Sequence, residues 1–447
     1  MSTISSYSQK VVIAGAGPVG LALACTLKSQ NKYSDITVYD KRPDPYLEFD
    51  ANKHRTHGLR ISRDAISFFN KILKKEIKHN PNINVSGAKD LQKQFSGWKG
   101  RFVRTHQIQS ALSEKAKKLG VKVLYNCGIS AQDLESLKNH DLESLNQVQK
   151  DLKEAQVIIG CDGSHSPVRD TLLKEKLSDV KMMQHLLELK FNTHVNVRQR
   201  SSKTASIHNA ECEEVDFESI GQAGEDGLKP GTLHLVIDEA TFNALRPKKT
   251  SIKTGDSETE SIKKGDSAHP WNLAELKLAA QTDRRIEKVY KTLMHYVASL
   301  HKRRGDCINE RISTLPLEIY RAENVCNVVN GKVVAICGDA SSGLIYERGF
   351  NKGIKEAGLC ALAVSDFFKS QADLTQKLST LPQSFKRYNQ QSKDLFVSER
   401  RWITFKITLI KIYKTFLYYI GTPYAMFRRN ILNKLRTKLF KILPPAC

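Results

Sequence analysis

The sequence predicts an α/β protein: a doubly wound domain in two sequence pieces, an inserted mixed β-sheet domain and a helical C-terminus. Three observations support this prediction. Residues 10–14 (KVVIA) form a short β-branched run, followed at once by a glycine-rich turn and an apolar helix-like segment. Two more β-branched runs, at 157–160 and 332–337, each lead into a Gly and Asp pair. The stretch between these two runs carries strand patterns of its own.

The glycine-rich turn has the spacing GxGxxG in its required strand–turn–helix context. Its glycines allow a tight turn, and they let a pyrophosphate approach the backbone at the helix N-terminus. A second β-like run, 36–39, ends at Asp40, twenty residues past Gly20, where an acidic group accepts hydrogen bonds from ribose hydroxyls. The pattern predicts a Rossmann-like dinucleotide site and by itself leaves NAD and FAD open. Its predicted contact residues are Gly15, Gly17, Pro18, Val19, Gly20, Asp40 and Lys41.

Two later segments favour a flavin. The first strand run leads to Asp162 and Gly163, and the second leads to Gly338 and Asp339, after which Gly349-Phe350-Asn351 opens a helical segment. Together with the N-terminal turn, this set resembles the class A FAD-dependent monooxygenases, the group of p-hydroxybenzoate hydroxylase and kynurenine 3-monooxygenase. The resemblance covers about residues 10–175 and 310–390.

The resemblance implies an FAD cofactor, with NAD(P)H as co-substrate. It places Asp339 at a ribityl hydroxyl of FAD, and it aims the helix that opens near Asn351 at the flavin pyrimidine, where negative charge develops on reduction. The segment around Asp162 is credited in the family with both FAD and NAD(P)H contacts. The carried-over cofactor residues are Arg55, Arg104, Gln109, Asp162, Gly163, Gly338, Asp339, Gly349, Phe350 and Asn351. For Arg55, Arg104 and Gln109 a solvated surface is the alternative.

The loop after Asp339 departs from the family pattern. It lacks the usual His and Pro and is shorter, which puts oxygen chemistry in doubt more than FAD binding. Its residues Tyr346, Glu347 and Arg348 are the predicted catalytic candidates, with loop packing as the alternative. The favoured function is an FAD-dependent monooxygenase that uses NAD(P)H and O₂ to hydroxylate an organic substrate. The alternatives are an FAD-dependent reductase or dehydrogenase without oxygenation, and a catalytically silent flavin-fold protein that binds a membrane or a partner.

The predicted domain order follows from these segments. Residues 8–178 and 321–375 form the two parts of the FAD-binding domain, and 179–320 form the substrate domain. The latter carries a low-complexity insertion at 247–268 that contains a near repeat rich in Lys, Gly, Ser and Asp. Residues 376–447 form a basic helical C-terminal region.

The net charge of the protein restricts which kinds of partner it is expected to bind. The formal net charge is +23, and residues 400–447 contain eleven basic residues and no acidic one. Amphipathic patterns in this segment suit an anionic membrane surface, or equally helices that pack on the protein. No nucleic-acid recognition motif accompanies the charge, so we expect no nucleic-acid partner.

Nine cysteines without CxxC spacing argue against a metal site and fit reduced thiols. The polar N-terminus argues against secretion. We therefore expect a cytoplasmic protein, with peripheral membrane attachment as the alternative.

Overall fold

The computed structural model divides the chain into two compact units, residues 1–180 with 319–447 and residues 181–318. The structure describes residues 9–31, 34–45, 47, 58–138, 145–193, 215–220, 229–246, 270–304, 307–345, 347–370 and 378–420. Arg55, Tyr346, the insertion at 247–268 and the basic segment beyond residue 420 lie outside these ranges.

A six-stranded sheet forms the centre of the first unit, in the order β11-β12-β6-β1-β2-β5. All neighbours are parallel except β11, which runs antiparallel to β12. Parallel strands covered on both faces need apolar side chains throughout, which explains the β-branched runs of the sequence. The strands are β1 (Lys10–Ala14), β2 (Asp35–Tyr39), β5 (Lys122–Leu124), β6 (Val157–Gly160), β11 (Cys326–Val329) and β12 (Lys332–Ile336).

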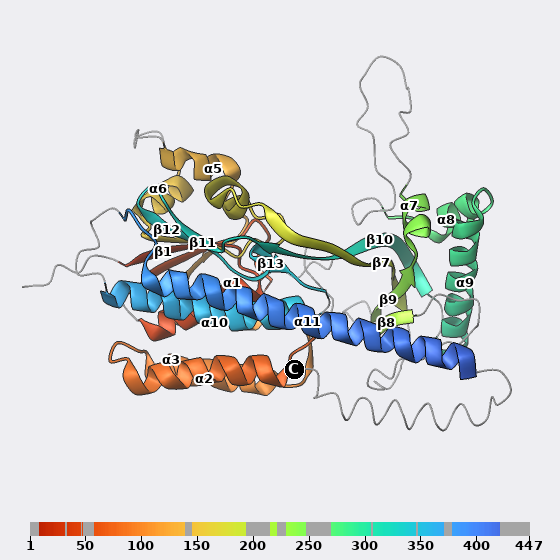
Figure 1. Ribbon diagram of the computed structural model, residues 1–447, viewed down its shortest axis with the longest axis horizontal. Helices are drawn as coiled ribbons and strands as arrows, with labels where there is room; N and C mark the ends of the chain where they lie inside the picture. Colours follow the sequence, from red (N-terminus) through yellow and green to blue (C-terminus); the bar gives the residue numbers. More distant parts are fainter. Residues whose placement is uncertain are drawn as a thin grey trace, which may run out of the picture. The chain divides into compact units, whose positions relative to one another are not determined.

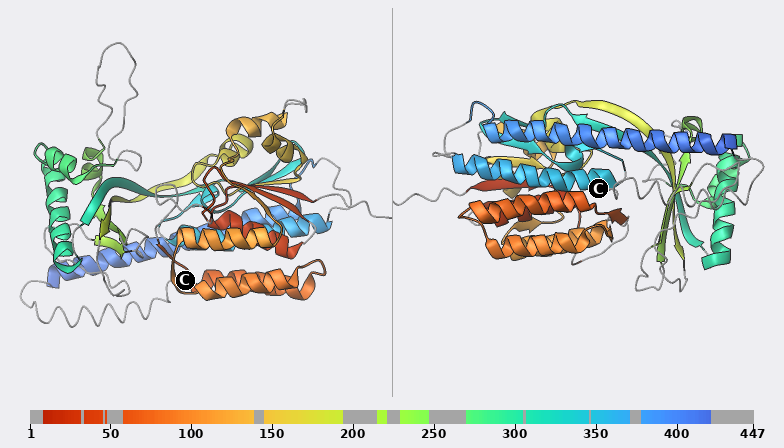
Figure 2. Two further views of the ribbon diagram at one scale, coloured as in Figure 1. Left: turned by 180° about the vertical axis from the view of Figure 1, so that it is seen from behind. Right: turned by 60° about the horizontal axis from the view of Figure 1, so that its bottom comes forward.

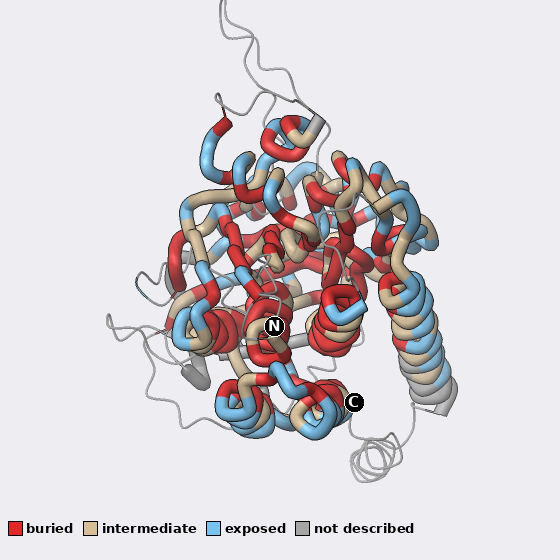
Figure 3. Tube along the Cα trace, turned by 90° about the vertical axis from the view of Figure 1, so that its left-hand side faces the viewer, coloured by how far each residue is buried: buried red, intermediate tan, exposed pale blue. Residues whose placement is uncertain are grey.

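Helices cover this sheet. The helices α1, α10, α11, α2 and α3 lie on one side of it, whereas α5 and α6 lie on the other (Figure 1). The central strands β1, β6 and β12 and the helices α1 and α10 are largely buried, and the buried residues gather in the middle of the tube drawing (Figure 3). The helices are α1 (Pro18–Gln30), α2 (Arg63–His79), α3 (Val85–Trp98), α4 (Thr105–Lys118), α5 (Ala131–Glu135), α6 (Gln147–Glu154), α10 (Glu347–Ser370) and α11 (Gln383–Ile420).

Short elements complete the first unit. A two-stranded antiparallel pair, β3 (Gly58–Arg60) and β4 (Phe102–Arg104), precedes α2 and α4 respectively. The turns η1 (Ser136–Lys138), η2 (Val168–Leu173) and η3 (Gly338–Ala340) follow α5, β6 and β12 in the chain. Strand β13 (Ser342–Gly343) pairs with Tyr320 and Arg321 at the end of β10.

The second unit is built on an antiparallel sheet. Its strands belong to the order β13-β10-β7-β9-β8, with β7 (Leu177–Thr193), β8 (Val215–Ile220), β9 (Lys229–Ile237) and β10 (Cys307–Ala322). Helices α7 (Glu239–Ala244), α8 (Leu273–Ala280) and α9 (Arg284–Arg304) pack on it, and they share a core with Leu187, Leu189, Leu233 and Leu235 of the sheet. Alternation along the strands leaves Glu188 and His234 on the opposite face.

This architecture confirms the predicted fold class: a doubly wound, largely parallel sheet in two sequence pieces, a second sheet inserted between them and a helical C-terminal part. The predicted domain borders stay a prediction. Among the described residues, no helix has both the length and the apolar character needed to cross a membrane.

Candidate functional site

The glycine-rich turn joins β1 to α1, and each of its glycines meets a different steric demand. Gly15 has a φ of 102°, and a Cβ placed there would lie 2.4 Å from the carbonyl oxygen of Cys161. A Cβ on Gly20 would lie 2.0 Å from the carbonyl oxygen of Gly15. A Cβ on Gly17, in contrast, would meet no atom within 4 Å. Two glycines therefore let the turn pack, and the third leaves space at the N-terminus of α1.

Asp40 lies at the end of β2 and closes this turn from the side. Its carboxylate accepts one hydrogen bond from the Ala16 N–H and one from the Arg42 N–H, both at 2.8 Å. Gln109, on α4, donates its side-chain amide to the Ala16 carbonyl at 2.8 Å. The glycine-rich turn is thus held between two polar side chains that are distant in sequence.

Asp162 follows β6 and is the most strongly perturbed carboxyl group at this end of the sheet. Burial raises its pKa to about 6, against hydrogen bonds from Ser166 and from the backbone N–H of Val168. Its Oδ1 is buried and has no hydrogen-bond partner among the described residues. The next residue, Gly163, has a φ of 94° and open space around its Cα. This segment therefore presents an unsatisfied acceptor beside free space.

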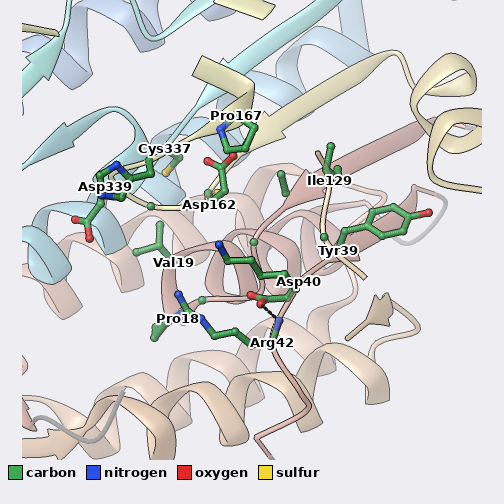
Figure 4. A pocket seen from close by; sticks show the side chains of 18 of the residues that line it. Pro18, Val19, Tyr39, Asp40, Arg42, Ile129, Asp162, Pro167, Cys337 and Asp339 are labelled. Atoms are coloured by element: carbon green, nitrogen blue, oxygen red, sulfur yellow. Dashed lines mark hydrogen bonds between the residues drawn. The ribbon is translucent and has the colours of Figure 1, made fainter. Parts of the chain in front are cut away.

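The turn η3 follows β12 and carries Asp339. Gly338 enters it with a φ of 69° and donates its N–H to Glu356 at 2.8 Å. Tyr320 donates its hydroxyl to the Asp339 carbonyl at 2.9 Å. Backbone bonds thus fix the turn, and the Asp339 side chain reaches the adjoining cavity (Figure 4).

The first turn of α10 meets the same place. Asn351 accepts the Ser62 N–H at 2.9 Å and donates to the Arg60 carbonyl at 3.0 Å, so it ties α10 to the segment after β3. A Cβ on Gly349 would lie 3.2 Å from Oδ1 of Asp339. The absence of that atom allows the positive end of the α10 dipole to approach this carboxylate.

One cavity of about 580 Å³ collects all these segments at the carboxyl ends of the parallel strands (Figure 4). Ligands of doubly wound sheets bind at this edge. The predicted cofactor residues that line it are Gly15, Gly17, Pro18, Val19, Asp40, Lys41, Asp162, Gly163, Asp339, Gly349 and Phe350.

Comparison with known proteins decides which ligand this cradle takes. Residues 8–225 match the family model described as "FAD binding domain". The chain carries an FAD-binding domain. FAD is rich in hydroxyl groups and contains a pyrophosphate. The site fits this cofactor, because it offers three carboxylates at strand ends, a buried Asp162 oxygen without a hydrogen-bond partner among the described residues, and open space at Gly17 and Gly163.

Solved structures give more distant likenesses. The Diels-Alderase PyrE3 is 15% identical, with 92% of this chain and 77% of that one covered and a TM-score of 0.49. CtdE, solved with FAD and a substrate, is 13% identical, with 89% of each chain covered and a TM-score of 0.45. CabE, an aromatic hydroxylase, is 13% identical, with 90% and 73% covered and a TM-score of 0.40. No protein with a curated description matches. Likenesses of this size do not identify a reaction.

Several predicted FAD residues do not line the cavity. Four of them instead contact the segments that line the cavity, through the contacts given above: Gly20, Gln109, Gly338 and Asn351. Arg104 pairs with Gly58 between β4 and β3, and burial lowers the pKa of its guanidinium group. Arg55 falls outside the residues that the structure describes.

The predicted catalytic loop has a different outcome. Arg348 does not line the cavity: its Nη1 donates to Oε2 of Glu399 on α11 at 2.8 Å, and its guanidinium carbon lies 3.6 Å from the centre of the Trp402 ring. Glu347 starts α10, but its side chain is not described, and Tyr346 is not described at all. The geometry therefore favours the packing alternative for Arg348.

Sequence reasoning missed other lining residues. They include Arg42, Thr105, Ser130, Cys161, His165 and Cys337. Cys161 and Cys337 directly follow β6 and β12, so their position after two parallel strands was a usable signal. Ser130 follows β5 across a short loop and carried no motif. Within the described part of the chain, no group of His, Cys, Asp and Glu could hold a metal ion.

Proposed function

We propose that this protein is an FAD-dependent monooxygenase that uses NAD(P)H and O₂ to hydroxylate an organic substrate. The observation that carries the proposal is the single cavity in which the glycine-rich turn, Asp40, the Asp162 segment, Asp339 and the first turn of α10 meet. This combination is typical of the class A flavin monooxygenases that the sequence resembles.

Each segment has a distinct role in the proposal. The N-terminus of α1, with open space at Gly17, would receive the pyrophosphate of FAD. Asp40 would accept hydrogen bonds from the adenosine ribose, and Asp339 would accept one from the ribityl chain. The N-terminus of α10, with Gly349 and Phe350 on the cavity wall, would stabilise negative charge on the flavin pyrimidine.

FAD, when bound, supplies the redox chemistry: it accepts a hydride from reduced nicotinamide and passes electrons to oxygen. The protein binds and orients the reactants and excludes water. Asp162 can hold a proton up to about pH 6, because burial raises its pKa to about 6. Tyr346 and Glu347 stay candidates for contact with the reacting groups.

The test begins with the purified protein, which should be yellow and release FAD on denaturation. NADH and NADPH oxidation is then followed with a panel of phenols and other organic substrates under ¹⁸O₂. A monooxygenase incorporates one labelled oxygen atom per nicotinamide oxidised. A reduced or dehydrogenated product without label supports the reductase or dehydrogenase alternative, which the short loop after Asp339 permits. Bound FAD without nicotinamide oxidation by any substrate supports the silent alternative.

We also propose that residues 400–447 contact an anionic membrane surface. Phe405 and Ile412, on α11, are exposed large apolar residues, 55% and 61% accessible, in a segment without acidic side chains. Each cation near an anionic surface contributes roughly 1 kcal/mol. Pelleting with vesicles containing phosphatidylserine should depend on salt and be lost on truncation at residue 400. Equal pelleting of both forms excludes this contact.

A further inference from the structure

The side chain of Arg348 is buried between α10 and α11. Only 6% of it is exposed, and its Glu399 partner is 8% exposed. Glu399 also meets the Lys355 ammonium group at 3.5 Å. Trp402, one turn further along α11, covers the guanidinium group with its ring at 3.6 Å. An ion pair shielded in this way holds its partners in one geometry, because moving either leaves an unpaired buried charge.

Arg348 directly precedes two residues of the FAD cavity. Gly349 and Phe350 line that cavity, and Asn351 fixes the same helical turn to the segment after β3. These residues share the first turn of α10, whose backbone moves as one body. The position of Arg348 against α11 therefore sets the position of Gly349 and Phe350 in the cavity wall.

A second contact joins α11 to the turn that carries Asp339, which lies next to Gly349 in the cavity wall. Ser392, on α11, donates its hydroxyl to Glu356, which is fully buried. Glu356 in turn accepts the N–H of Gly338 at 2.8 Å and pairs with the buried Lys352 at 2.7 Å. Gly338 opens the turn that carries Asp339, so one hydrogen-bonded chain links α11 to that turn.

We infer that α11 is a brace for the FAD site and that Arg348 is a positioning residue of this site. Through Glu399 and Trp402 the brace sets the first turn of α10, and through Ser392 it supports the turn that bears Asp339. The helices α10 and α11 run side by side along this contact (Figures 1 and 2). The inference depends on the FAD site and is independent of oxygen chemistry.

The same two helices offer a matched control. Arg387 on α11 faces Asp366 on α10 at 3.9 Å, with side chains 62% and 45% exposed. Asp366 lies about 25 Å along α10 from Gly349, at 1.5 Å per residue. Arg387→Gln therefore removes an α10–α11 ion pair without altering Arg348, Glu399, Trp402 or Ser392.

The experiment measures FAD affinity, by quenching of flavin fluorescence, on FAD-free full-length protein. Glu399→Gln and Arg348→Gln are each expected to raise the dissociation constant about tenfold, the size of a coupling between packed neighbours. The double variant should lose little more than either single one. Ser392→Ala should raise the constant about threefold, and Arg387→Gln should leave it within twofold of wild type.

Two further measurements separate positioning from folding. Unfolding midpoints of the FAD-free variants are compared, and the visible spectrum of bound flavin is recorded, since a displaced α10 shifts that spectrum. Where a variant fails to fold, Arg348→Lys and Trp402→Phe replace it, with about threefold effects expected. Wild-type affinity and spectrum in the folded brace variants, or an equal loss of affinity in Arg387→Gln, would overturn the inference. Because no turnover is measured, failure of the monooxygenase proposal leaves this test intact.

Discussion

The two units present functional groups in different ways. In the first unit the cavity is walled by backbone turns, and the glycines at 17 and 163 leave space beside them. In the second unit the polar cluster rests on side chains: Glu188 of β7 is paired in register with His234 of β9, at 3.0 Å, on the face opposite the apolar core. Glycine turns leave a sequence signature, whereas a cross-strand pair depends on register, which is set by the whole sheet. The difference explains why the glycine-rich turn could be predicted from the sequence and the Glu188–His234 pair could not.

The largest expected effect comes from Gly15→Ala. A Cβ at this position overlaps the Cys161 carbonyl, and the alanine would have to adopt a φ of 102°. We therefore expect a loss of roughly 3–5 kcal/mol in unfolding free energy. Urea unfolding measures this loss. The matched variant, Gly17→Ala, meets no atom within 4 Å and should retain stability while FAD affinity falls at least tenfold. Equal stability of the two variants would contradict this account of the turn.

Glu188→Gln tests the second unit. Burial alone raises the pKa of Glu188, but the hydrogen bond with His234 and the charge of Lys190 outweigh it and lower the pKa to about 2. Since the folded-state pKa is depressed, the stabilisation is present above about pH 4.5 and is lost as the pH falls toward 2. We expect the variant to lose about 2 kcal/mol at pH 7 and much less at pH 2. Its FAD affinity should equal that of wild type. A changed affinity would show that the Glu188–His234 pair also affects the cavity of the first unit.

Asp162→Asn should change the stability in the opposite direction, raising it at neutral pH. Because the folded-state pKa is raised to about 6, the stability contribution of Asp162 is fully present below about pH 4 and is lost as the pH rises through 6. Asparagine removes the ionisation, so the FAD-free variant is expected to be about 2 kcal/mol more stable than wild type at pH 7. The two proteins should differ least near pH 4. A pH-independent difference in urea unfolding would show that desolvation of this carboxylate is not the cause.

The smallest effect is expected at Glu114→Gln. Glu114 pairs with Lys118 one turn along α4, and these side chains are 43% and 69% exposed. Such surface pairs contribute about 0.5 kcal/mol or less, and the unfolding free energy should change by no more. This variant calibrates the others, because Lys352 and Glu356 have the same spacing but are buried. A loss as large as that of Glu188→Gln would mean that exposure does not separate these pairs.

Prediction from sequence went furthest where function depends on local backbone. The turn at 15–20, Asp40, the Asp162 segment and Asp339 were all identified, and they meet in one cavity. Prediction stopped at side chains whose direction depends on distant partners. Arg348 was a catalytic candidate with loop packing as the alternative, and the structure shows that a glutamate 51 positions away in the sequence holds it against α11. Its neighbours in the chain gave no sign of this partner.

The sequence by itself determined the fold class and the strand–turn–helix cradle, because strand patterns and glycine turns are encoded within a few consecutive residues. Its resemblance to a family of flavin enzymes then indicated FAD. Only the tertiary structure decided which residues wall the cavity, that Gln109 and Asn351 hold that wall together, and that α11 braces it. These assignments require segments tens to hundreds of residues apart to meet, and burial there makes a polar side chain take whichever partner the packing supplies.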